Sequence, residues 1–367
     1  MSVPELLGHR AAIEGLWRAA AGERLPHALL FRGPAGVGKF RAARWFAQGL
    51  LCQRGKEAGG APGAPCGTCG PCKRMLSGNH PDLFVIDARE HRQDQITIHF
   101  ISHRDERPKD AYQGPALEDF LLLRALEGGY RIVLIRECER MNEAAQNALL
   151  KVLEEPAPGT VLVLECSVPA RLLATVRSRT TAVEFPLLEE EAVRRILLAE
   201  LEHDSELSPD PELSIGGAEG GELTELVALA QGSPGRGLTL RSQGALGMQR
   251  LFGDVAAGVR SERGAADAFW ELEGEFPGKT ARASARLQAA TFIDLGLGLL
   301  LRAERAAHQA AGGAGGQRDA QRARRRWCME QWLQARQDLE LNLSPEAVVE
   351  RALYALHPDA AVTRGTP

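Results

Sequence analysis

The stretch "GPAGVGKF" has the residue types and spacing of a loop that binds phosphate. In the pattern G-x-x-x-x-G-K-[ST], backbone N–H groups surround the phosphates, the lysine reaches the outer phosphates, and the final hydroxyl binds magnesium. Gly33, Gly38 and Lys39 occupy the required positions with Gly36 between them, but Phe40 stands where the hydroxyl residue belongs. The loop therefore predicts a nucleotide cradle that lacks one magnesium ligand.

A second departure from the pattern affects the same ion. In working sites a buried strand ends in an Asp that binds magnesium, whereas the corresponding strand here ends "IVLIRE", with Arg136 at the Asp position and Glu137 after it. A cation at position 136 repels magnesium. We predict a degenerate site with no ATPase activity of its own. It either holds ATP or ADP without competent magnesium coordination or persists as a folded glycine turn without nucleotide.

Four of the seven cysteines form a cluster in the sequence. Cys66, Cys69 and Cys72 lie in "CGTCGPC", where two C-x-x-C steps share a cysteine, and Cys52 ends the preceding helical stretch. Four thiolates predict a structural tetrahedral zinc site, and an iron–sulfur cluster is the chemical alternative. The other cysteines, Cys138, Cys166 and Cys328, are expected to be buried packing residues.

Alternating strands and helices must position these residues. Apolar runs at 27–31, 82–87, 131–139 and 160–167 predict strands, and helical patterns follow several of them. Strands that alternate with helices indicate a mostly parallel α/β sheet covered on both faces. Beyond Pro186 the patterns are helical, except for a loop predicted at 205–223 and the glycine-rich interruption "AAGGAGGQR".

The composition excludes some classes of protein. The formal net charge of −4 argues against a surface that grips nucleic acid throughout. The basic stretch 318–327 is interpreted as a solvated helix face, with contact to DNA phosphate or an acidic partner as the alternative. No basic-then-apolar leader and no run of 18 apolar residues is evident, which predicts a cytoplasmic protein without membrane contact. The odd number of cysteines argues against a disulfide framework.

Several stretches, in this order, resemble one known family. "LPHALLFRGPAGVGKF", "CGTCGPCKRMLSGNHPDLFVI", "RIVLIRECERMNEAAQNALLKVLEEP" and "LLATVRSRT" are similar to the AAA+ subunits of the bacterial sliding-clamp loader, which is part of the DNA polymerase III holoenzyme. The lost magnesium positions resemble the delta-prime class of these subunits rather than the gamma/tau ATPases. The likeness covers residues 1 to about 240 well, and the remainder matches weakly through "LELNLSPEAVVERAL".

The resemblance implies a division of the chain. It implies an AAA+ P-loop-type domain at 1–186 with the zinc module inserted at 52–72, and a small helical lid domain at 187–243. An all-helical collar domain for oligomerisation would follow at 244–358, and then a tail at 359–367.

The resemblance also implies a role in DNA replication. Arg179, in "SRT", would act as an arginine finger on the ATP of a neighbouring subunit, and Arg236 falls near a second sensor arginine but one residue displaced. The partners would be gamma/tau-type ATPase subunits and the delta subunit, with the β sliding clamp and primer–template DNA reached through the complex. Two alternatives stay open: an active gamma/tau-type ATPase, and a stand-alone zinc-containing nucleic-acid-binding protein.

Overall fold

A computed structural model describes residues 6–22, 24–54, 63–103, 107–127, 129–207, 219–278, 280–309 and 316–357. The chain divides into two compact units. The first takes residues 1–213 and 230–236, and the second takes residues 214–229 and 237–367. The predicted tail at 359–367 lies outside the described residues.

The first unit is built on a five-stranded parallel sheet in the order β2-β3-β4-β1-β5. The strands are β1 (Ala28–Arg32), β2 (Leu83–Ile86), β3 (Arg131–Ile135), β4 (Thr160–Cys166) and β5 (Thr181–Glu184). Each crossover carries helical structure, as parallel strands require. The predicted α/β class with a parallel sheet is confirmed.

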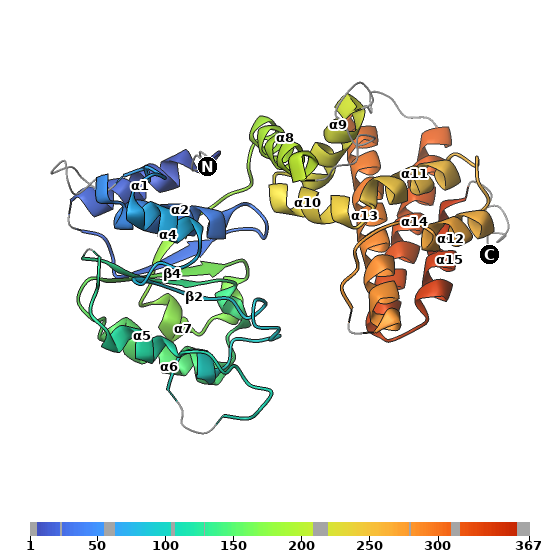
Figure 1. Cartoon of the computed structure of the whole chain (residues 1–367). Helices are drawn as coiled ribbons and strands as arrows, with labels where there is room; N and C mark the ends of the chain where they lie inside the picture. The colour runs from blue at the N-terminus through green and yellow to red at the C-terminus, as the bar shows by residue number, and fades with distance from the viewer. Residues whose placement is uncertain are drawn as a thin grey trace. The chain divides into compact units, whose positions relative to one another are not determined.

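Helices cover both faces of this sheet (Figure 1). On one face lie α1 (Arg10–Ala21), α2 (Lys39–Leu51) and α4 (Gly70–Leu76). On the other lie α5 (Leu117–Leu122), α6 (Glu143–Glu154) and α7 (Ala174–Arg177). Successive side chains of a strand point to opposite faces of the sheet, so alternate residues pack into the two hydrophobic cores. In β1, Leu29 and Phe31 join the α1/α2 core, while Ala28 and Leu30 join the α6 core.

One predicted strand is too long. The apolar run at 131–139 was expected to be extended throughout, but β3 ends at Ile135. Glu137 adopts a left-handed conformation with φ +46°, and the 3₁₀ turn η2 (Cys138–Arg140) follows. Two further 3₁₀ turns are η1 (Ile98–Phe100) and η3 (Pro169–Arg171). The chain thus turns sharply at the position where the nucleotide-site residues begin.

The loop predicted at 205–223 is partly helical. The helix α8 (Glu190–Leu207) extends into its start, and α9 (Glu219–Ala230) begins before its end. The intervening residues 208–218 lie outside the described residues. After α9, the segment 230–236 belongs to the first unit and leads into α10 (Pro234–Ser242).

The second unit is all-helical in its described residues. It contains α11 (Ala245–Ala256), α12 (Glu262–Trp270), α13 (Ala281–Gln309), α14 (Gly316–Glu340) and α15 (Pro345–Leu356). Part of the predicted interruption "AAGGAGGQR" lies outside the described residues, and the rest belongs to α14.

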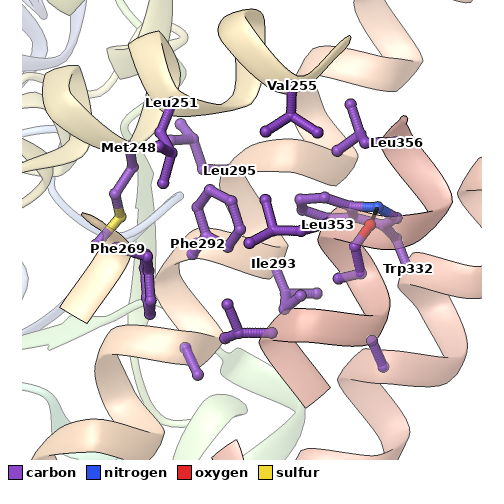
Figure 2. Close-up of a cluster of buried hydrophobic side chains, with 14 of the residues drawn as sticks. Met248, Leu251, Val255, Phe269, Phe292, Ile293, Leu295, Trp332, Leu353 and Leu356 are labelled. Carbon is purple, nitrogen blue, oxygen red and sulfur yellow. Dashed lines mark hydrogen bonds between the residues drawn. The ribbon is translucent and has the colours of Figure 1, made fainter. Parts of the chain in front are cut away.

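The core of this unit forms around Trp332, which is fully buried (Figure 2). Its indole Nε1 donates a hydrogen bond to the Ala352 carbonyl at 2.9 Å, and Phe292 packs beside its ring. The helix α13 is long and apolar enough to cross a membrane by length and composition alone. Its Phe292 and Ile293 are buried in this core.

Candidate functional site

A phosphate-type loop connects β1 to α2. Gly38 is the N-cap of α2 with φ +100°, and Gly36 has φ +75°, conformations that glycine adopts without strain. Gly33 follows directly after β1, where a Cβ would lie 2.0 Å from the Phe185 carbonyl oxygen. These three positions place the loop between the end of a strand and the start of a helix, which is the context a phosphate cradle requires.

Lys39, the lysine of this loop, is turned back onto the protein. Its side chain is 1% exposed, and its Nζ donates to the carbonyls of Gly33 at 3.0 Å and Pro34 at 2.7 Å. The same nitrogen lies 2.9 Å from the Ser167 Oγ and 3.1 Å from the Glu165 Oε1. An ammonium has three donors, so these acceptors occupy its full capacity.

The two unusual residues of the magnesium position touch each other. The guanidinium of Arg136 lies over the Phe40 ring, 5.0 Å from its centroid, in a cation–π contact. The same guanidinium is 2.8 Å from Asp87 Oδ2, a carboxylate that is 4% exposed. A magnesium ion needs oxygen ligands in octahedral geometry. An aromatic ring and a paired cation supply none, so these residues do not fit the ion.

Glu137 is likewise directed to cationic partners. Its carboxylate lies 2.5 Å from Arg89 and 3.4 Å from Arg140, while its backbone N–H donates to Glu165 Oε2 at 2.9 Å. Asp87 and Glu165 were missed from the sequence, because each is an ordinary acidic residue at a strand end. Only the parallel register, which pairs Phe31 with Glu165, places the latter beside the loop.

A segment that precedes and begins α10 closes over the loop. The Gly235 N–H donates to the Gly36 carbonyl at 2.9 Å, and the Ser233 hydroxyl donates to the Ala35 carbonyl at 2.8 Å. The approach is close enough that a Cβ on Gly235 would lie 2.8 Å from the Gly36 Cα. Arg236, the displaced sensor candidate, donates instead to Gln231 Oε1 at 2.9 Å.

These groups surround a cavity of about 490 Å³, which is large enough for a nucleotide. Its walls combine the loop, the ends of β3 and β4, one side of α2, the end of α4 and Gly235 of the closing segment. The charged and polar lining residues are Lys39, Arg41, Arg44, Gln48, Arg136, Glu137, Glu165 and Ser167.

The four predicted zinc ligands come together in space. The Sγ atoms of Cys52, Cys66, Cys69 and Cys72 all lie within 4.8 Å of one another. The Cys52–Cys69 and Cys66–Cys72 sulfur pairs are each 3.9 Å apart. Zinc–sulfur bonds of about 2.3 Å at tetrahedral angles place sulfurs roughly 3.8 Å apart, so the residues fit a structural zinc ion.

The surroundings of the cysteines suit metal binding. The Thr68 hydroxyl and the Cys69 N–H donate to Cys66 and lower the pKa of its thiol to about 5, so the thiolate that zinc requires forms readily. Burial raises the pKa of Cys72 above its ordinary value, and a bound cation would offset that effect. The predicted packing cysteines Cys138, Cys166 and Cys328 are all buried.

Arg179 lies after α7 and does not line the cavity in the described part of the chain. Its guanidinium is 2.6 Å from Glu154 Oε1 at the end of α6, and it also donates to the Thr175 carbonyl at 3.0 Å. The side chains are 37% and 51% exposed, so this ion pair faces solvent.

The basic stretch 318–327 lies on α14. Arg324 donates to the Leu356 carbonyl at 3.0 Å, and Arg325 lies 3.3 Å from Glu304. The side chains of residues 318 and 319 lie outside the described part of the chain. Two of the arginines are thus engaged within their own unit.

A parallel sheet in the order β2-β3-β4-β1-β5, with a phosphate-type loop between β1 and α2 and helices on both faces, is the P-loop fold of the AAA+ class. Residues 8–189 match the family model described as "DNA polymerase III, delta subunit". The chain belongs to the family of DNA polymerase III delta-prime subunits, within the clamp-loader group of AAA+ proteins.

The sequence of the chain is similar to those of bacterial delta-prime subunits, and its fold aligns with that of a solved structure. The chain is 37% identical over 251 residues, 68% of its length, to DNA polymerase III subunit delta' of Pseudomonas aeruginosa, and 35% identical over 183 residues, 50% of its length, to that of Bacillus subtilis. The matches span 62% and 49% of those relatives. A gamma subunit-related protein of Thermotoga maritima aligns with a TM-score of 0.48 at 16% identity, over 95% of this chain and 99% of the other.

Proposed function

We propose that this chain is a clamp-loader subunit that hydrolyses no ATP itself and supplies Arg179 to the ATP site of a neighbouring ATPase subunit. The observation that carries the proposal is the contact between Arg136 and Phe40 at the magnesium position of its own cleft. Phosphoryl transfer depends on a magnesium ion that bridges the outer phosphates. Phe40 and Arg136 offer no oxygen ligand at the two positions that hold this ion in working sites, so the cleft lacks the coordination that the reaction needs.

The exposure of Arg179 supports a role on another subunit. An arginine finger acts by bringing a guanidinium to the developing phosphate charge, either in cis or in trans. Arg179 is outside its own cavity and reaches solvent, paired with Glu154. Exposed ion pairs contribute about 0–1 kcal/mol, so the far stronger charge of a neighbour's triphosphate can displace Glu154.

The proposed partners follow from the family and from the second unit. Clamp-loader relatives are named as tau/gamma and delta-prime subunits of DNA polymerase III. The all-helical second unit would join this chain to gamma/tau-type ATPase subunits and the delta subunit. The assembled ring would open the β sliding clamp and place it on primer–template DNA, with zinc in a structural role.

Reconstitution of the ring tests the proposal. With Arg179→Ala, the ATPase activity stimulated by clamp and primed DNA should fall at least tenfold at the neighbouring ATP site that Arg179 contacts in the proposed ring. Arg179→Lys should restore only part, because lysine lacks the planar fork. Arg177→Ala removes an exposed arginine two positions away and is the matched control. Full activity with Arg179→Ala would exclude the finger role.

The isolated chain separates the alternatives. It should show no magnesium-dependent ATP turnover, whereas an active gamma/tau-type ATPase would. A stand-alone nucleic-acid-binding protein would bind DNA directly with a steep salt dependence.

A further inference from the structure

The lysine of the phosphate loop already has an anionic partner inside the protein. Lys39 and Glu165 are 3.1 Å apart with side chains 1% and 8% exposed, so the pair is screened little by solvent. In nucleotide-bound loops of this type the lysine reaches the β- and γ-phosphates. Here a carboxylate from β4 takes that place.

Glu165 also accepts a backbone hydrogen bond on its second oxygen. Its Oε2 receives the Glu137 N–H at 2.9 Å, at the left-handed turn that follows β3. One carboxylate thus joins the phosphate loop to the end of the neighbouring strand. A terminal phosphate at the same place would need the same donors, namely an ammonium and N–H groups.

We propose that Glu165 stands in for a terminal phosphate and makes the cleft discriminate against nucleoside triphosphates. A γ-phosphate would have to displace the carboxylate from Lys39 and would then lie beside a like charge. A nucleoside diphosphate lacks that group and needs only the N–H groups of the loop and the first turn of α2. The ligand class of the cleft is therefore a nucleoside diphosphate bound without a divalent cation.

The assignment goes beyond the role of Arg179 and does not depend on it. It concerns the chain's own cleft, and it is tested on the isolated protein, whereas the finger is tested in the assembled ring. Loss of magnesium binding alone does not predict a preference for ADP, because a site without magnesium could still bind ATP and ADP with equal affinity. The distinguishing quantity is the ratio of the two dissociation constants.

Calorimetric titration of the full chain with ADP and with ATP measures this ratio. The buffer contains no magnesium and no chelator, so that any zinc stays in place. The wild type should bind ADP at least tenfold more tightly than ATP, a difference of 1.4 kcal/mol. In Glu165→Gln the dissociation constant for ATP should fall at least tenfold, and the preference for ADP should disappear.

Two variants control for charge and shape. Glu165→Asp retains the carboxylate and should retain the preference for ADP. Glu184→Gln changes the net charge equally at the end of β5, outside the cavity lining, and should also retain it. Equal affinities in the wild type, an unchanged ratio in Glu165→Gln, or no binding of either nucleotide would overturn the proposal. If Glu165→Gln does not fold, the wild-type ratio and Glu165→Asp decide the matter.

Discussion

The buried pair of Lys39 and Glu165 makes the phosphate-loop lysine a structural residue. Lys39→Met removes the cation while keeping a side chain of similar length. Within the described part of the chain, the buried Glu165 charge then keeps the Glu137 N–H as its hydrogen-bond donor. Breaking a buried ion pair by removing one partner costs about 3–5 kcal/mol. We therefore expect Lys39→Met to lower the free energy of unfolding of the first unit by that amount.

Removal of the carboxylate charge by Glu165→Gln should lower the free energy of unfolding by less than Lys39→Met does. In Glu165→Gln, Lys39 keeps three acceptors, the carbonyls of Gly33 and Pro34 and the Ser167 hydroxyl, so its charge stays hydrogen-bonded. A loss of about 1–2 kcal/mol is expected, because one net hydrogen bond to a charged group is removed. The double variant should be about 1 kcal/mol more stable than Lys39→Met. Together with the cost of about 1–2 kcal/mol for Glu165→Gln alone, this corresponds to a coupling energy of about 2–3 kcal/mol, within the range for contacting residues.

Hydrogen exchange measured by mass spectrometry is the appropriate assay. The two units can unfold separately, so one global transition does not report on either of them. Peptides from α2 and β4 give the opening free energy of the first unit, and peptides from α14 serve as an internal reference. A cost below 1 kcal/mol for Lys39→Met, or a double variant no more stable than it, would refute the reasoning.

Two further predictions concern the helical unit and the cysteine cluster. In α13, a Cβ on Gly296 would lie 1.9 Å from the Trp332 ring, so Gly296→Ala should destabilise the second unit by about 1–3 kcal/mol. A Cβ on Gly298 would meet one flexible Arg302 atom at 3.9 Å, so Gly298→Ala should stabilise the unit by about 0.5–1 kcal/mol. Hydrogen exchange of α14 peptides during thermal unfolding distinguishes the two variants. In zinc-free protein, the Cys66 thiol should stay deprotonated as the pH falls to about 5, because its pKa is lowered to about that value. Alkylation of Cys66 by iodoacetamide should therefore slow only when the pH is lowered below about 5. Burial raises the pKa of Cys72, so this thiol should remain unreactive at neutral pH, and added zinc should protect both cysteines. An alkylation rate of Cys66 that already decreases as the pH is lowered from about 8 would contradict this prediction.

The local parts of the site were predictable because their signals lie in adjacent residues. The glycine loop lies between β1 and α2 as its spacing predicts, and the four cysteines come together. The backbone position of Lys39 follows the pattern, but its side chain contacts Glu165 and Ser167, which the pattern did not predict. The end of β3 was not predictable in this way. The letters "IVLIRE" are equally compatible with an extended chain, and the turn at Glu137 is held by its N–H bond to Glu165, 28 residues away.

The features of the site that were not predicted from the sequence depend on residues far apart in the chain. Asp87 and Glu165 acquire their roles only when parallel strands align their carboxyl ends at one edge of the sheet. Gly235 and Ser233 meet the loop through contacts that span nearly 200 residues. No pattern in neighbouring residues reports such pairings, because they arise from packing.

The contact between Arg136 and Phe40 has a consequence for descent. Restoring a hydroxyl at position 40 alone would take away the ring beneath the guanidinium, and restoring an acid at position 136 alone would set a second carboxylate beside Asp87. Each single change thus gives up a favourable contact or adds a like charge, so single substitutions do not lead stepwise to a magnesium-binding pair at these positions. Both positions would have to change together.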